Sequence, residues 1–303
     1  MSSSNHTPRA LTIAGSDSGG GAGIQADLKA FARCGVHGMS AITAITVQNT
    51  LGVSAVHLIA PEVILAQVRA VVTDIGVDAV KVGMLGDATV IRAVAQALEE
   101  LPSGTPVVVD PVMVAESGGE LLDPDAEGAL VAEILPRATI LTPNAPEARA
   151  LARHASPSTH RTTGAGISTT SEHGPDAWSR GDVADGEEAE AAALARAVLS
   201  LGPDIVVLTG GHRTQAVDLF LDSSAPEQIV SIPGARHQDG AAHGSGCTHS
   251  SVLAAQLALG RAPLQAAFAA RALAGAAVAG GLRDVGEGAG PVDVIGLARL
   301  RPH

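Results

Sequence analysis

Short apolar runs alternate with helical segments along most of the chain, and this alternation restricts the fold more than any other feature. The expected strands span residues 9–14, 39–47, 53–59, 79–82, 106–109, 138–141 and 204–208. The expected helices span residues 24–33, 61–72, 89–98, 126–135, 187–201, 250–259 and 264–279. Strands that are separated by helices usually pair in parallel, with helices on both faces of the sheet. We therefore predict an α/β fold with a mainly parallel central sheet, and an antiparallel strand pair at residues 217–221 and 228–232 near a sheet edge.

Length and composition fit one large domain over residues 1–303. Hydrophobic residues make up 46% of the chain, which is enough for a sizeable core. The net charge is −12, and the chain has one Trp, three Phe and no Tyr, so nucleic acid is not an expected partner. Residues 152–186 are rich in Ser, Thr, Gly and His without apolar periodicity, which predicts a mobile surface insertion.

Three further sequence signals concern the compartment. Residues 1–8 are polar, which predicts a flexible N-terminus and no secretory signal. An uninterrupted apolar run of about 18 residues is absent, so no membrane partner is expected. The two cysteines, Cys34 and Cys247, form no C-x-x-C pair, which argues against a disulfide scaffold and a structural zinc site. We expect a cytoplasmic protein.

A glycine-rich loop, residues 15–23, joins the first expected strand to the first expected helix. In open α/β sheets such a loop faces the ligand crevice. Residues 21–26 match the G-x-G-x-x-A pattern of dinucleotide-binding loops, but the next strand ends in Gln48-Asn49 and lacks the acidic residue that would hold a ribose. The Gly-Lys-Ser/Thr of a phosphate-binding P-loop is missing too. The loop is therefore expected to contact a small polar molecule, and the amide of Gln48 suits the edge of a heterocycle.

A second glycine-rich turn, residues 242–248, runs directly into an apolar helix that stops at Gly260. Such a turn aims several backbone N–H groups at one spot, and the helix dipole adds positive charge there, so the spot suits phosphate. Cys247 lies beside it, where a thiol is expected to lose its proton more readily than in water. The alternative is an ordinary helix N-terminus after flexible glycines, with Cys247 as a small core residue.

Three acidic residues have both a functional and a purely structural interpretation. Asp110 directly follows a strand, at the expected ligand crevice, although it could also cap the turn before Pro111. Glu147 could reach Mg²⁺ directly or through water, although its spacing from Asn144 also fits a helix capping box. Asp27 lies one turn inside its helix, and without another role it would be a solvated acid that favours the helix N-terminus.

Six segments resemble a known family. They are LTIAGSDSGGGAGIQADLK at 11–29, ITAITVQNT at 42–50, KVGML at 81–85, VDPVM at 109–113, LTPNAPEA at 141–148 and HGSGCT at 243–248. Together and in this order they resemble the hydroxymethylpyrimidine/phosphomethylpyrimidine kinases of thiamine biosynthesis, in the ribokinase-like superfamily. The resemblance extends from about residue 9 to residue 292, apart from residues 152–186.

This resemblance implies a ribokinase-like fold, a homodimer and two phosphorylations that use ATP and Mg²⁺. The first acts on 4-amino-5-hydroxymethyl-2-methylpyrimidine, and the second converts its monophosphate to the diphosphate. The implied pyrimidine pocket comprises Gly15, Asp27, Gln48, Met84 and Val112. The implied catalytic segment comprises Gly244, Ser245 and Gly246, which would hold the transferring phosphate, and Cys247, where the family has its base. Asp110 and Glu147 would lie near Mg²⁺, and Asn144, Thr209 and Gly211 near ATP.

The sequence departs from this family at two points and leaves alternatives open. Thr209 stands where many relatives have a Lys that would neutralise phosphate charge, and the turn contains Gly-Ser-Gly in place of the commoner Gly-Thr-Gly. A pyridoxal kinase of the same superfamily is the nearest alternative function. A non-catalytic pyrimidine-binding protein is the second alternative, which the presence of Asp110, Glu147 and Cys247 argues against.

Overall fold

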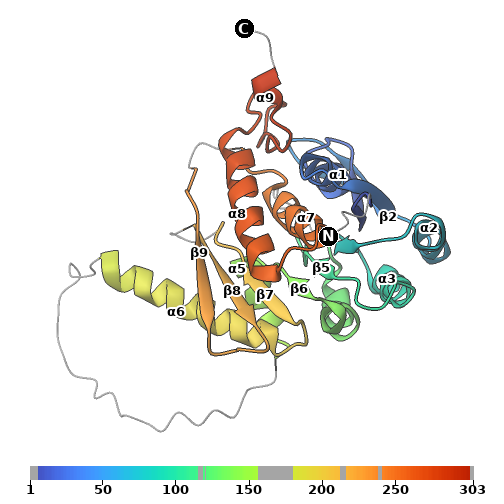
Figure 1. The fold of residues 1–303 in the computed structure, drawn as a ribbon. Coiled ribbons are helices and arrows are strands. Elements are labelled where there is room, and N and C mark those ends of the chain that lie inside the picture. Colours follow the sequence, from blue (N-terminus) through green and yellow to red (C-terminus); the bar gives the residue numbers. More distant parts are fainter. Residues whose placement is uncertain are drawn as a thin grey trace.

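A mixed β-sheet forms the centre of the molecule. The computed structural model describes residues 6–114, 119, 121–155, 180–211, 216–237 and 241–300. Within these residues nine strands form one sheet in the order β3-β2-β1-β4-β5-β6-β7-β8-β9 (Figure 1). The strands are β1 (Arg9–Asp17), β2 (His37–Gln48), β3 (Val53–Leu58), β4 (Ala79–Val82), β5 (Val107–Val109), β6 (Ile140–Leu141), β7 (Ile205–Leu208), β8 (Val217–Asp222) and β9 (Ile229–Pro233).

The strand pairing confirms the predicted mainly parallel sheet. All pairs from β2 through β1, β4, β5 and β6 to β7 are parallel. The edges are antiparallel, because β3 pairs with β2 as a hairpin and β8 and β9 follow β7 as a meander. Parallel strands end at the same edge of a sheet, so the segments that follow β1, β4, β5, β6 and β7 lie close together.

Helices cover both faces of the sheet. One face carries α1 (Gly23–Arg33), α7 (Ser245–Ala258) and α8 (Pro263–Ala279), which pack against one another (Figure 1). The other carries α2 (Pro61–Asp74), α3 (Ala88–Glu99), α5 (Ala145–Ala152) and α6 (Arg180–Leu199). The alternating pleat separates the two cores: Leu11 belongs to the α2/α3 side, whereas its neighbour Ala10 belongs to the α1/α7 side.

Two expected helices differ from the structure. The helix expected over 126–135 is a series of short turns: η1 (Pro124–Ala126), α4 (Glu127–Ala129), η2 (Leu130–Ile134) and η3 (Leu135–Arg137). Pro136 cannot donate a backbone hydrogen bond, which is incompatible with a regular helix at that point. The helix expected over 187–201 begins at Arg180, so residues 180–186 of the predicted insertion are helical. Residues 156–179 of that predicted insertion, and residues 1–5 of the predicted flexible N-terminus, lie outside the described residues.

The late helix also begins earlier than expected. α7 begins at Ser245 rather than at residue 250, so residues 245–248 of the glycine-rich turn form the first turn of the helix itself. Gly244 is its N-cap and has a φ of 84°, a left-handed conformation that favours glycine. A four-residue helix, α9 (Leu297–Leu300), comes last in the described chain. Across the described residues, none of the helices combines the length and the apolar character that crossing a bilayer requires.

Candidate active site

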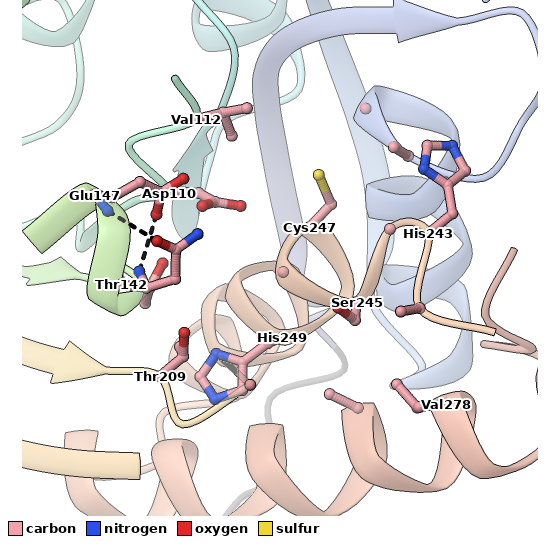
Figure 2. A pocket seen from close by; sticks show the side chains of 18 of the residues that line it. Asp110, Val112, Thr142, Glu147, Thr209, His243, Ser245, Cys247, His249 and Val278 are labelled. Atoms are coloured by element: carbon pink, nitrogen blue, oxygen red, sulfur yellow. Dashed lines mark hydrogen bonds between the residues drawn. The ribbon is translucent and has the colours of Figure 1, made fainter. Parts of the chain in front are cut away.

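A cavity of about 530 Å³ opens at the carboxyl ends of the parallel strands. Its walls come from the segments that follow β1, β4, β5, β6 and β7, together with the first turn of α7 and one side of α8. Figure 2 shows the arrangement: the acidic residues Asp110 and Glu147 lie on one side, Cys247 projects from α7 into the space beside them, and His243 lies beyond it. Both glycine-rich segments border this one cavity.

The structure brings together nearly all the predicted site residues. Those that line the cavity are Gly15, Gln48, Met84, Asp110, Val112, Asn144, Glu147, Thr209, Gly211, Gly244, Ser245, Gly246 and Cys247. Their common location is an observation, and their separate roles stay predictions. Asp27 is the predicted residue that is missing from the cavity wall.

Asp27 is fully buried and bound within the protein, which corrects both interpretations of this residue. Its carboxylate accepts hydrogen bonds of 2.6 Å from Thr12 and from Ser251. Nζ of Lys81 lies 3.1 Å from each of its two oxygens. The side chains of Asp27 and Lys81 are both 0% exposed. Asp27 is therefore neither a wall of the pyrimidine pocket nor a solvated helix-terminal acid, because every interaction it makes here is internal.

Lys81 is the cation under the site, and sequence reasoning did not select it. It stands in the short buried strand β4 and borders the cavity. Burial alone would lower the pKa of its ammonium group, but the carboxylate of Asp27 and the neighbouring Cys247 and Asp110 raise it. Lys81 is therefore charged. The sequence did contain a signal for this residue, namely a lysine within a continuous apolar run. Such a lysine is expected to be buried, and a buried charge requires a partner.

The Cys247 thiol lies at the start of α7 and is partly exposed to the cavity. The surrounding protein raises its pKa to about 12, because burial is only partly offset by Lys81 and the carboxylates of Asp110 and Asp27 raise the pKa further. The expectation of an easily ionised thiol was therefore wrong. At neutral pH the group is a thiol, and the position next to a helix N-terminus does not outweigh the desolvation and the nearby negative charge.

The predicted anion cradle corresponds to the first turn of α7. The N–H of Ser245 donates to Ala242 at 2.9 Å, and the first hydrogen bond within the helix runs from the N–H of Thr248 to Gly244 at 2.9 Å. The N–H groups of Gly246 and Cys247 precede that bond and have no acceptor inside the helix. A Cβ at Gly244 would overlap the carbonyl oxygen of Gly21, so the two glycine-rich segments touch directly.

Asp17 and His243 tie these two segments together, and the sequence analysis missed both residues. Nε2 of His243 lies 3.0 Å from Oδ2 of Asp17. The same carboxylate accepts backbone N–H groups of Gly19, Gly21 and Ala22 at 2.7–3.0 Å. Burial alone would raise the pKa of Asp17, but these donors lower it overall. The loop between β1 and α1 is thus organised around one carboxylate that also fixes the segment before α7.

Asp110 and Glu147 form an acidic pair on the opposite wall (Figure 2). Oδ2 of Asp110 accepts a hydrogen bond of 3.0 Å from Ser250. Glu147 accepts one of 2.9 Å from the N–H of Asn144, whose side chain caps α5 in return, so the predicted capping box is present. Burial raises the pKa of Asp110. Burial and the charge of Asp110 raise that of Glu147 to about 8. Two carboxyl groups that repel each other, one buried and one partly buried, are a fitting environment for a divalent cation.

The described residues contain no group of three or more His, Cys, Asp or Glu that could hold a metal without help.

A second polar group that sequence reasoning missed lies on the α8 side of the cavity. Asp218 on β8 accepts a hydrogen bond of 2.8 Å from the N–H of Gly210. Nε2 of His249 lies 3.1 Å from its Oδ2, and Nη1 of Arg271 lies 3.8 Å from its Oδ1. Burial alone would raise the pKa of Asp218, but His249 and Arg271 lower it overall. The three residues come from β8, α7 and α8, and no local sequence pattern connects them.

Solved structures similar to this chain include two kinases of small molecules. The pyridoxal kinase of Bacillus subtilis, solved as an ADP complex, has a TM-score of 0.77 and 33% identity, covering 98% of this chain and 100% of that one. The phosphomethylpyrimidine kinase of Clostridium difficile 630 has a TM-score of 0.66 and 35% identity, covering 87% and 96%. Fold and cavity thus define a ribokinase-like α/β kinase.

The family follows from the sequence comparisons. The phosphomethylpyrimidine kinase family model matches residues 17–175 and 180–293. The hydroxymethylpyrimidine/phosphomethylpyrimidine kinase of Rhizobium meliloti (strain 1021) is 44% identical over 289 residues, which are 94% of this chain and 96% of that protein. This chain belongs to the phosphomethylpyrimidine kinase family.

Proposed function

We propose that this chain phosphorylates 4-amino-5-hydroxymethyl-2-methylpyrimidine with ATP, and then converts the monophosphate to the diphosphate, in thiamine biosynthesis. The observation that carries the proposal is the single cavity that joins the β1–α1 loop, the first turn of α7 and the Asp110–Glu147 pair. In the proposal, the acceptor pocket, the phosphate cradle and the acidic pair surround this one space. The relatives named hydroxymethylpyrimidine/phosphomethylpyrimidine kinase support the same activity.

The proposed acceptor side comprises Gly15, Gln48, Met84 and Val112, which all line the cavity. The side-chain amide of Gln48 can donate to and accept from the edge of an aminopyrimidine. Oε1 of Gln48 already lies 3.0 Å from the hydroxyl of Thr46, which orients the amide. The structure therefore favours Gln48, without Asp27, as the polar contact to the pyrimidine.

Phosphoryl transfer depends on positioning and on neutralising charge, because its transition state is loose. The first turn of α7, Gly244 to Gly246, would hold the transferring phosphoryl group. Asn144, Thr209 and Gly211 would contact ATP from the ends of β6 and β7. Mg²⁺, held by Asp110 and Glu147, would neutralise phosphate charge when bound.

Cys247 would orient the acceptor hydroxyl. Since its pKa is about 12, it enters the reaction as a thiol and not as a preformed thiolate base. A loose transition state requires little deprotonation of the alcohol before the new oxygen–phosphorus bond forms, so hydrogen bonding to the hydroxyl is sufficient.

The decisive assay measures ATP consumption by the purified chain with hydroxymethylpyrimidine and with its monophosphate, followed by product mass. We expect one added phosphate in each case. Cys247→Ala should lower turnover at least tenfold, with little change in acceptor affinity, and Cys247→Ser should retain more activity because it keeps a hydrogen-bonding group. Unchanged turnover in Cys247→Ala would remove the side chain from the mechanism and leave the backbone cradle as the main catalyst.

Pyridoxal is the second candidate acceptor, because the B. subtilis pyridoxal kinase has 33% identity and a TM-score of 0.77. Parallel assays with equal concentrations of both alcohols separate the two activities, and we expect the higher kcat/KM with the pyrimidine. The homodimer, the single domain over residues 1–303 and the cytoplasmic location remain part of the proposal. Light scattering of the purified chain tests the dimer.

A further inference from the structure

His249 has an arrangement that the proposed mechanism does not use. It lies in the second turn of α7, borders the cavity and is 4% exposed. Its Nε2 is 3.1 Å from Oδ2 of Asp218. Among the described residues, however, neither of its ring nitrogens has a partner in hydrogen-bonding geometry. A buried imidazole costs free energy unless its nitrogens are satisfied, so this ring is arranged for something that the protein alone does not supply.

The position of His249 on the helix determines which substrate it can meet. Successive residues of an α-helix are about 100° apart, so Cys247 and His249 project to different sides of α7. Figure 2 shows the sulfur of Cys247 directed towards Val112, on the acceptor side, and the ring of His249 beside Thr209, at the end of β7. One helix turn therefore presents a thiol to the acceptor and an imidazole to the opposite part of the cavity.

The surroundings of this ring favour an anion. Asp218 is fixed by the N–H of Gly210 and lies between His249 and Arg271. Arg271 also donates to the carbonyl oxygen of Ala216, and its Nε has no partner among the described residues. The guanidinium balances the charge of this carboxylate, and the ring nitrogens of His249 and Nε of Arg271 remain without hydrogen-bond partners among the described residues.

We propose that Nδ1 of His249 donates a hydrogen bond to the phosphate chain of the nucleotide, with the ring held in place by Asp218. This rests on the proposed use of ATP and adds a residue to it. In this arrangement Nε2 faces the carboxylate of Asp218 at 3.1 Å, and Nδ1 is the ring nitrogen left for a phosphate oxygen. His249 is thus a binding residue on the nucleotide side of α7, complementary to Cys247 on the acceptor side.

The experiment uses three substitutions of His249 and two probes, ADP and adenosine, titrated by calorimetry into the purified chain. Asn places its amide nitrogen near the position of Nδ1, Gln places its own near Nε2, and Leu supplies neither. Hydrogen bonds to charged groups lead us to expect that His249→Leu and His249→Gln weaken ADP binding about ten- to a hundredfold. His249→Asn should remain within about threefold of the unsubstituted chain.

Adenosine affinity should stay unchanged in all three variants, and so should the affinity for hydroxymethylpyrimidine. His57→Asn, at an exposed position on β3, is the matched control and should change neither. Equal losses of affinity for adenosine and ADP would place the contact on the nucleoside and overturn the proposal. An ADP affinity that is unchanged in all three variants would overturn it too. So would an ADP affinity that is retained in His249→Gln but lost in His249→Asn. Because binding is measured without turnover, a chain that binds ADP but phosphorylates no pyrimidine would contradict the proposed function and leave this inference intact.

Discussion

Replacing Lys81 by Met tests the buried ion pair on which the site is built. Lys81 and Asp27 are fully buried, with Nζ 3.1 Å from both carboxylate oxygens. Asp27 also accepts from Thr12 on β1 and Ser251 on α7. The group therefore joins β4, β1, α1 and α7, and the last of these carries the cradle and Cys247. Met has a similar length and fills the space of the lysine stem without its charge.

The loss of unfolding free energy expected for Lys81→Met depends on the hydrogen bonds that Asp27 retains. Removing one partner of a buried ion pair typically costs about 3–5 kcal/mol, because the other charge is left uncompensated. Here the carboxylate keeps two short hydroxyl donors, so we expect the lower end, about 3 kcal/mol. For a chain of this size that corresponds to a fall of roughly 5–10 °C in the melting temperature.

Urea unfolding monitored by circular dichroism measures the free energy, with Lys29→Met as the matched control. Lys29 is the chain's other lysine and makes one hydrogen bond, to the carbonyl oxygen of Gly20 at 2.6 Å, so its loss should cost about 1 kcal/mol or less. The double variant Lys81→Met/Asp27→Asn removes both buried charges and should recover about 1–2 kcal/mol relative to Lys81→Met.

Two results would refute this reasoning. The first is a Lys81→Met variant whose free energy of unfolding lies within about 1 kcal/mol of the unsubstituted chain. The second is a double variant that is no more stable than the single one. A third measurement links stability to the site: because Lys81 lowers the pKa of Cys247, Lys81→Met should slow alkylation of that thiol at any fixed pH below 9.

Three further predictions concern the loops and the pH dependence of stability. Gln48→Ala should weaken hydroxymethylpyrimidine binding about tenfold and ATP binding little, since it removes one polar contact on the acceptor side. Isothermal titration of each ligand measures the two losses of affinity. A larger loss for ATP than for the pyrimidine would move Gln48 to the nucleotide side. Gly244→Ala should lower kcat at least tenfold. The φ of 84° at this position costs an alanine about 1–2 kcal/mol, and the added Cβ would push away Gly21. A fully active variant would show that the contact between Gly21 and Gly244 does not set the geometry of the active site. Burial alone would raise the pKa of Asp78, but hydrogen bonds from Arg9 and His6 lower it to about 2 from 3.8, so its stabilising effect is present above pH 3.8 and lost as the pH falls towards 2. Asp78→Asn should flatten the free energy of unfolding between those pH values, and an unchanged acid dependence in urea titrations would contradict the assignment.

The sequence predicted those features that depend on local pattern. Apolar runs separated by helices gave the parallel sheet, and the spacing of Asn144 and Glu147 gave the capping box at the start of α5. The ends of parallel strands lie at one edge of the sheet, which is why the sequence alone could predict that a strand-end residue such as Asp110 borders the cavity.

Features that depend on packing between distant segments were not predictable in the same way. Asp27 and Lys81 are 54 residues apart and meet only because β1 lies next to β4 while α1 packs against α7. Read alone, Asp27 has the pattern of a solvated first-turn acid. The pKa of Cys247 was misjudged for the same reason: the helix N-terminus is visible in the sequence, but the carboxylates of Asp110 and Asp27 that surround the sulfur are not.

The high pKa of Cys247 changes what the active site has to accomplish. A thiol that stays protonated cannot drive the reaction by removing the proton of the alcohol in advance, so the rate must depend on how well acceptor and phosphate are aligned. We expect that alignment to be set where the β1–α1 loop touches the first turn of α7, through the contact of Gly21 with Gly244 and the hydrogen bond between Asp17 and His243. Substitutions at this contact should therefore reduce turnover at least as much as Cys247→Ser, although none of these residues except Gly244 belongs to the phosphate cradle.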